Sequence, residues 1–206
     1  MSRKEFLDRR TAAKRTAVMD AARRRFAAEG LDGASVERIA HDAQVSTATL
    51  YRQFSSKLAL FEAVLRDGLT AFDETLSASA TLPARERLAR LAEAYAAMLD
   101  DPLSVGIIRA VFTAAPASPK VAQIFYGGVK LSVFGAIDSA AAAVAADNDI
   151  GAGMDHTKAG RHLMGMIEHS TLWRRLISNE PGEETPEAIA QEALRVFWAA
   201  YPGKEK

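Results

Sequence analysis

The sequence predicts an all-α protein. Apolar residues recur at helical spacing along most of the 206 residues, and no segment shows a clear strand-like alternation of apolar and polar residues. One helix start signal, a capping-type residue followed by proline, occurs three times, at Asp101-Pro102, Ser118-Pro119 and Thr185-Pro186. Proline suits the first helical position because the N–H that it lacks would have no intrahelical acceptor there. The chain is therefore expected to be a series of helices in one or two domains.

The same signals give approximate helix boundaries. The first helix is expected from about Asp8 to Glu29, with Phe26 as its core anchor and Gly30 as a left-handed stop. A fourth helix starts near Ser56, and its apolar stripe continues to Leu76, so it is expected to be long. The other helices are expected over residues 35–43, just after Ser46, and over 84–100, 102–115, 118–146, 155–178 and 186–200. Residues 147–153 are expected to form a turn-rich loop.

Charge is divided unevenly along a chain whose net charge is zero. Residues 1–66 contain 13 Lys and Arg against 8 Asp and Glu, whereas residues 67–206 contain 13 against 18. A basic N-terminal part fits nucleic-acid binding, because Lys and Arg displace counterions from phosphates. No apolar run reaches the roughly 18 residues of a membrane span, and the first 15 residues are too charged for a signal peptide. A cytoplasmic protein is therefore expected.

The most informative segment is residues 45–57. It follows a short amphipathic helix, residues 35–43, after a turn of a few residues, and it contains a second short helix with a polar outer face. Two short helices joined in this way indicate a helix-turn-helix motif. Thr47, Thr49 and Arg52 would face outward on the second helix, where a hydroxyl, a methyl group or a guanidinium can contact base edges or phosphates.

The order and spacing of these residues resemble the N-terminal domain of the TetR family of transcriptional regulators. The match covers about residues 10–66 and is carried by Phe26-Ala27-Ala28-Glu29-Gly30, Ser35-Val36, Ile39-Ala40, Ala43, Val45-Ser46, Thr49-Leu50-Tyr51, Phe54 and Ser56-Lys57. Two positions depart from the family pattern, since Gln44 and Ala48 stand where glycine is usual or common. A non-glycine residue in a left-handed turn costs about 1–2 kcal/mol, which a packed domain can absorb.

The resemblance implies a helix-turn-helix DNA-binding domain over residues 1–66. A long helix would join it to a helical ligand-binding and dimerisation domain over residues 67–206. By this resemblance Tyr51 and Lys57 contact the DNA backbone. The hydroxyl of Ser46 is expected to cap the recognition helix. The residues expected to bind DNA are Ser35, Val36, Ser46, Thr47, Ala48, Thr49, Tyr51, Arg52 and Lys57.

The second domain contains more large apolar side chains than one helix face needs, and some are expected to line a cavity with a few polar groups. The residues expected to bind a ligand are Tyr95, Met98, Ile108, Arg109, Phe112, Phe125, Phe134, His162, Met166 and His169. The last two helices have apolar stripes suited to a pairing of two helix pairs, and the resemblance implies a dimer there. The residues expected at the dimer interface are Leu163, Ile167, Ser170, Trp173, Ile189, Ala193, Val196 and Phe197.

The function expected from the resemblance is a homodimeric, ligand-responsive transcriptional regulator. It would be a repressor that a small, largely apolar effector releases from a palindromic operator. An activator or a corepressor-dependent regulator with the same fold is the alternative, and a helical ligand carrier or enzyme is a further one. The sequence has no nucleophile-base-carboxylate set, no phosphate loop and no cysteine, and none of its four histidines has a partner histidine at metal-binding spacing. No catalytic residue, metal site or cofactor is therefore expected.

Overall fold

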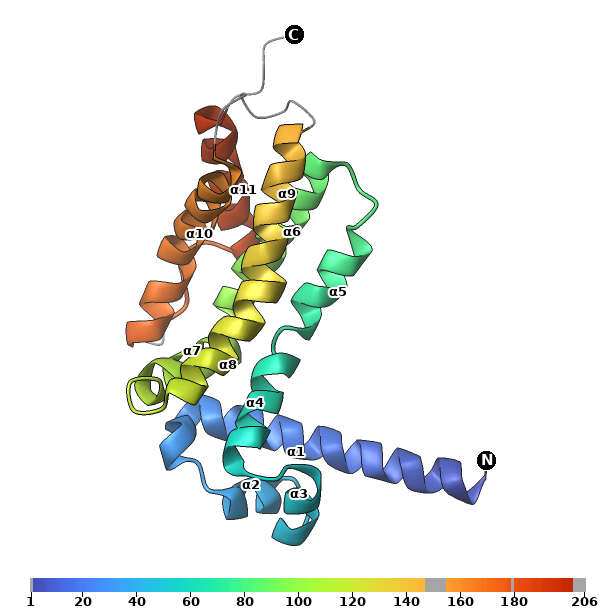
Figure 1. The fold of residues 1–206 in the computed structure, drawn as a ribbon. Coiled ribbons are helices and arrows are strands. Elements are labelled where there is room, and N and C mark those ends of the chain that lie inside the picture. Colours follow the sequence, from blue (N-terminus) through green and yellow to red (C-terminus); the bar gives the residue numbers. More distant parts are fainter. Residues whose placement is uncertain (1, 147–154, 179, 202–206) are drawn as a thin grey trace. The chain divides into compact units, whose positions relative to one another are not determined.

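The computed structural model describes residues 2–146, 155–178 and 180–201, and all regular secondary structure in these ranges is helical (Figure 1). The all-α prediction is therefore confirmed. The predicted loop at 147–153 lies outside the described residues.

The chain forms two compact units that are interleaved in sequence. Unit 1 contains the residues up to Gly68 together with Gly106–Phe125, and unit 2 contains Leu69–Val105 and the residues from Tyr126 onward. The predicted division at residue 66 is continuous in sequence, whereas here a segment from the middle of the chain joins the N-terminal helices. The chain consequently passes between the units three times.

Unit 1 is built around the helix-turn-helix segment. Its helices are α1 (Arg3–Gly33), α2 (Val36–Asp42), α3 (Thr47–Gln53) and α4 (Lys57–Asp67), with most of α7 (Pro102–Ala114) and the first part of α8 (Pro119–Val129). Phe26 on α1 is fully buried, as predicted, and meets Phe61 of α4 edge to face with ring centroids 5.0 Å apart. Ile107 and Val111 of α7 belong to the same buried cluster.

The first helix starts earlier than the predicted Asp8. Ser2 and Glu5 form a capping box, in which the Glu5 N–H donates to the Ser2 hydroxyl and the Ser2 N–H donates to the Glu5 carboxylate. The predicted stop at Gly30 is confirmed, because its φ of 72° and ψ of 177° interrupt the helix in a region open to glycine. A short helical turn then continues to Gly33.

The predicted long fourth helix is two helices. The helical hydrogen-bond pattern of α4 ends at Gly68, and α5 (Thr70–Ala78) starts after the buried Leu69. Glycine has a low helix propensity, and this one stands at the boundary between the two units. The apolar stripe alone did not reveal the break, because the apolar spacing continues on both sides of it.

The proline start signals are confirmed at α7, α8 and α11 (Pro186–Ala200). The Thr185 hydroxyl accepts the N–H of Ala188 at 3.2 Å, as expected of a capping residue. The predicted helix over 118–146 is one helical stretch that consists of α8, a π-helical turn (Lys130–Phe134) and α9 (Gly135–Ala146).

Unit 2 is organised around α6 (Ala84–Asp100), which packs against α5, α9, α10 (His156–Ser178) and α11. Two polar links join α6 to α10 inside this packing. The buried Tyr95 hydroxyl donates to the Glu168 carboxylate, and Arg175 pairs with Asp100 at 2.6 Å. Burial, followed by the nearby Glu168 carboxylate, raises the pKa of Tyr95.

One stretch, Pro119–Ala145, is long and apolar enough to cross a membrane by length and composition. Within an 18-residue window of this stretch, 40% of the residues are buried inside the protein. A partly buried helix of a folded domain passes the same test, so the stretch is weak evidence for a membrane span.

The contact between α7 and α1 in unit 1 depends on a glycine. A Cβ at Gly106 would lie 2.7, 2.8 and 2.9 Å from the Cβ, carbonyl oxygen and Cα of Ala27. We predict that Gly106→Ala lowers the free energy of unfolding by about 1–3 kcal/mol, because two of these three atoms are backbone. Denaturant unfolding measures this, with Gly127→Ala as the control, since a Cβ there meets nothing within 4 Å. Equal stability of the two variants would contradict the close packing.

Candidate nucleic-acid interface

Two serine caps define the helix-turn-helix geometry. The Ser35 hydroxyl accepts the Arg38 N–H at 3.3 Å at the start of α2, and the Ser46 hydroxyl accepts the Thr49 N–H at 3.1 Å at the start of α3. The predicted Ser46 cap is thus confirmed.

Gln44, in the turn between the helices, has a φ of 55°, so it adopts the left-handed conformation in which glycine is usual. The turn therefore holds a non-glycine residue in the left-handed conformation.

The exposed face of α3 contains four of the residues expected to bind DNA. Thr47, Ala48, Tyr51 and Arg52 are exposed, and Tyr51 retains 48% of its surface. Leu50 is fully buried and fixes the opposite face against the core of unit 1. The outer face of α3 therefore offers a hydroxyl, a phenol and a guanidinium side by side on one helix.

Thr49 has a different environment from Thr47. It is half-buried, and its hydroxyl lies 2.9 Å from the Ser46 hydroxyl oxygen. Its hydroxyl is therefore engaged in the helix cap, whereas that of Thr47 is on the exposed face.

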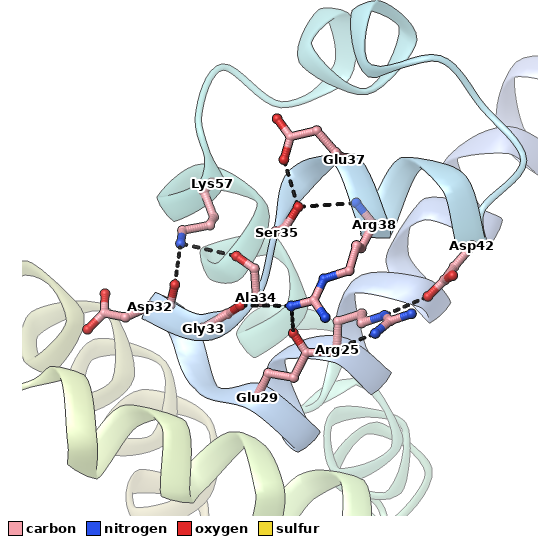
Figure 2. A network of polar contacts seen from close by, with 10 residues as sticks. All are labelled: Arg25, Glu29, Asp32, Gly33, Ala34, Ser35, Glu37, Arg38, Asp42 and Lys57. Atoms are coloured by element: carbon pink, nitrogen blue, oxygen red, sulfur yellow. Dashed lines mark hydrogen bonds and ion pairs between the residues drawn. The ribbon is translucent and has the colours of Figure 1, made fainter.

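The start of α2 combines a buried and a half-buried candidate. Val36 is 5% exposed and belongs to the core of unit 1, while the half-buried Ser35 donates its hydroxyl to the Glu37 carboxylate at 2.7 Å (Figure 2). That hydrogen bond is the main cause that lowers the pKa of Glu37, with a smaller contribution from the charge of Lys57. Ser35 thus already has an anionic partner, which a phosphate would have to replace.

Lys57 is a cation in the first turn of α4, a place where the helix dipole favours an anion. Its amine instead donates to the carbonyl oxygens of Asp32 and Ala34, each at 3.2 Å (Figure 2). These carbonyls belong to the end of α1 and to the link into α2. Lys57 therefore ties the start of α4 to the segment that positions α2.

An ion-pair network that the sequence analysis missed joins α1 to α2. Arg25 contacts Asp42 at 2.6 Å and Glu29 at 2.7 Å, and Arg38 contacts Glu29 at 2.6 Å (Figure 2). Arg38 also donates to the Gly33 carbonyl at 3.2 Å. The signal in the sequence was the i, i+4 spacing of Arg25 and Glu29, but the cross-helix pairs depend on how α1 and α2 pack.

The residues expected to bind a ligand are not brought together in one unit. Ile108, Arg109, Phe112 and Phe125 lie in unit 1, and Phe125 packs there against the core cluster. The remaining six lie in unit 2, where Tyr95 is buried, Met98, Phe134 and Met166 are half-buried, and His162 and His169 are exposed.

An open groove of about 630 Å³ lies on the α10–α11 face of unit 2. It combines three of the ligand candidates with four of the residues expected at the dimer interface: His162, Met166 and His169, and Ser170, Ile189, Ala193 and Val196. Trp173 on α10 is 51% exposed. By contrast, Leu163, Ile167 and Phe197 are fully buried within the chain.

Two short helices, a tight turn between them and an exposed polar face on the second helix define a helix-turn-helix DNA-binding module. The family model of the N-terminal domain, bacterial regulatory proteins of the TetR family, matches residues 18–64, and the model described as AefR-like transcriptional repressor, C-terminal domain, matches residues 86–203. The chain therefore belongs to the TetR family of transcriptional regulators, whose members are DNA-binding regulators and not enzymes. No curated protein matches the chain significantly.

Solved structures support the same fold. A TetR-family regulator from Mesorhizobium loti has a TM-score of 0.77 at 24% identity, with 94% of this chain and 98% of that chain covered. FadR from Bacillus subtilis in complex with stearoyl-CoA has a TM-score of 0.74 at 17% identity, with 88% and 96% covered. The flavonoid-responsive regulator FrrA has a TM-score of 0.66 at 23% identity, with 93% and 98% covered.

The Arg25–Asp42 pair makes stability depend on pH in a defined direction. The hydrogen bond from Arg25 lowers the pKa of the Asp42 carboxyl below its ordinary 3.8. The unfolded chain therefore takes up this proton at a higher pH than the folded chain, so the stabilisation is present above pH 3.8 and is lost as the pH falls through the folded-state pKa.

We predict that Asp42→Asn lowers the free energy of unfolding at pH 7, and that the difference from the parent protein shrinks as the pH falls below 3.8. Denaturant unfolding across this pH range measures it. Asp20→Asn, at an exposed position of α1, is the matched control. A stability difference for Asp42→Asn that stays constant with pH would contradict the role of the ion pair.

Proposed function

We propose that the protein is a homodimeric, cytoplasmic repressor that binds a pseudo-palindromic operator and is released from it by a small, largely apolar effector. The observation that supports this proposal best is the open face of α3, where Thr47, Tyr51 and Arg52 are exposed while Leu50 anchors the helix from behind. A helix fixed on one side and polar on the other suits the major groove.

The residues on this face have different chemistry toward DNA. Arg52 donates several hydrogen bonds in a fork that fits guanine or phosphate, and Thr47 offers a hydroxyl and a methyl group to a base edge. Tyr51 offers a single hydroxyl that suits a phosphate oxygen. We therefore assign base reading to Thr47 and Arg52, and positioning on the backbone to Tyr51.

Lys57 and Ser35 would position the module on the DNA backbone. The Lys57 ammonium has three N–H donors, and two of them are used by the carbonyls of Asp32 and Ala34. The third can donate to a phosphate without loss of the internal bonds. The Ser35 hydroxyl would exchange its bond to the Glu37 carboxylate for one to a phosphate.

Dimerisation is proposed through the groove face of α10 and α11. One short recognition helix contacts few base pairs, whereas a two-fold dimer can read two half-sites about 34–36 Å apart or at a multiple of that spacing. The exposed Val196 and Trp173 lie on these two helices, and Ile177 on α10 is 82% exposed. Burial of these side chains against a second copy removes apolar surface from water.

The effector is proposed to act by a population shift. Proteins with this fold include a FadR bound to stearoyl-CoA and a flavonoid-responsive regulator, which supports a small and largely apolar effector here. An effector that binds one conformation of the dimer preferentially lowers operator affinity by that difference, about 1.4 kcal/mol per tenfold. Because the helical link is interrupted at Gly68, we propose that α4 alone, rather than one long helix through α4 and α5, moves α3.

The proposal is tested by binding of the purified protein to genomic fragments, including the DNA beside its own gene, at two salt concentrations with excess competitor DNA. A discrete, salt-sensitive complex on a two-fold-symmetric site is the expected result. Release of this complex by a small molecule supports a repressor of the proposed type, whereas formation only with a small molecule indicates a corepressor-dependent regulator. Absence of a specific complex under either condition would contradict the proposal.

The division of roles on α3 predicts two different mutant effects. Tyr51→Ala should weaken binding to all operator variants by a similar factor, because a phosphate contact carries no sequence information. Thr47→Ala should change the order of preference among variants, by about 1–3 kcal/mol at the base it contacts. Mobility shifts on a panel of single-base operator variants measure both effects. A uniform loss for Thr47→Ala would remove the support for base reading.

The dimer face predicts a defined change in assembly. Val196→Asp should convert the dimer to a monomer at micromolar concentration, because it places an unpaired charge in an apolar interface. Light scattering coupled to gel filtration measures the molar mass. Gln191→Asp, at an exposed position of α11 outside the groove, is the control and should remain dimeric. A dimer in both variants would place the interface elsewhere.

A further inference from the structure

The first half of α1 extends beyond the buried core of unit 1. We call residues 2–16 the N-terminal arm. Every side chain that the structure describes between Ser2 and Thr16 is exposed, and the first buried residue of α1 is Val18. The arm extends over about 21 Å at the rise of an α-helix, and Figure 1 shows it running outward past α3 within unit 1. The family model of the DNA-binding domain matches from residue 18 onward, so the arm lies outside it.

The arm is helical for local reasons. The capping box of Ser2 and Glu5 closes its first turn, and Ala12, Ala13 and several Arg and Lys residues have high helix propensity. The arm also continues a helix that the core already holds, so no new helix nucleus has to form. The arm is thus a helix whose described side chains are exposed to solvent.

The net positive charge of the arm indicates an anionic partner. Residues 2–16 contain six Lys and Arg against two Asp and Glu. Arg10 and Lys14 are exposed and four residues apart, so they lie on one face of the helix. The two large apolar residues, Phe6 and Leu7, are adjacent in sequence and form no stripe along the helix, which disfavours a membrane surface or an apolar groove.

The base of the arm lies beside the recognition helix. The Arg15 guanidinium lies over the Phe54 ring, 4.6 Å from its centroid, and Phe54 is the residue that ends α3. A duplex bound on the outer face of α3 would therefore continue near the arm. A basic helix at this place can neutralise phosphates of the same duplex.

We propose that the N-terminal arm is a second DNA-contacting element, which binds phosphates flanking the bases read by α3 and does so without sequence preference. This inference rests on the proposed function, because it assumes that α3 binds DNA. The arm adds affinity and lengthens the contact along the duplex, while α3 alone reads the bases.

The test compares three proteins on arbitrary-sequence duplexes of about 20 and about 40 base pairs over a range of salt concentrations. The arm variant combines Arg9→Gln, Arg10→Gln and Lys14→Gln, since glutamine keeps the helix propensity. The control variant combines Arg90→Gln, Lys158→Gln and Arg195→Gln, which removes the same charge from exposed positions of unit 2. Circular dichroism and thermal unfolding establish that all three proteins are folded.

The arm variant is expected to bind the longer duplex at least about tenfold more weakly at 0.1 M salt. The slope of log affinity against log salt should fall by about 0.9 for each lost phosphate contact, so by up to about 2.7, while the control retains the parent slope. The affinity of the parent protein should increase more from the shorter to the longer duplex than the affinity of the arm variant does.

An arm variant with the parent affinity and slope would overturn the proposal. So would arm-dependent binding to vesicles of anionic phospholipid with no change in DNA binding. If Tyr51→Ala abolishes DNA binding while the arm variant retains it, only the arm proposal fails. If the parent protein binds no duplex at any salt concentration, the proposed function and the arm proposal fail together.

Discussion

Burial of Phe26 against Phe61 is the contact on which the rest of unit 1 depends. The two rings join α1 to α4, and Leu50, Ile39 and Ile107 belong to the same buried cluster, so α2, α3 and α7 are fixed relative to them. Because Leu50 is fully buried, α3 has only one orientation in which its polar residues face outward. The proposed DNA-reading surface is thus a consequence of apolar packing on the other side of a seven-residue helix.

Polar contacts inside unit 1 use part of its basic charge for structure. Arg25 and Arg38 pair with carboxylates of α1 and α2, and Lys57 donates to two backbone carbonyls. These three cations fix the helices that position α3. Exposed cations of the N-terminal arm and of α3, and the third N–H donor of Lys57, are proposed to meet phosphates, so only part of the basic charge in the N-terminal part of the sequence is assigned to DNA.

Local signals predicted the fold well where the cause of a feature is local. Proline starts, the Ser46 cap and the Gly30 stop depend on a few neighbouring residues, and they were found from the sequence. The return of α7 to unit 1 and the cross-helix pairing of Glu29 with Arg38 depend on tertiary packing, so no spacing indicated them. The contact of the Thr49 hydroxyl with the Ser46 hydroxyl was also not predicted from the sequence. Nor did the sequence indicate that the residues expected to bind a ligand are divided between the two units.

The central claim is that the outer face of α3 meets DNA, and hydrogen–deuterium exchange of the full-length chain with and without bound duplex tests it most directly. The account predicts slower exchange at Thr47–Gln53 and at the start of α2 when the duplex is present. Slower exchange confined to unit 2, with α3 unchanged while the duplex is bound, would contradict the account.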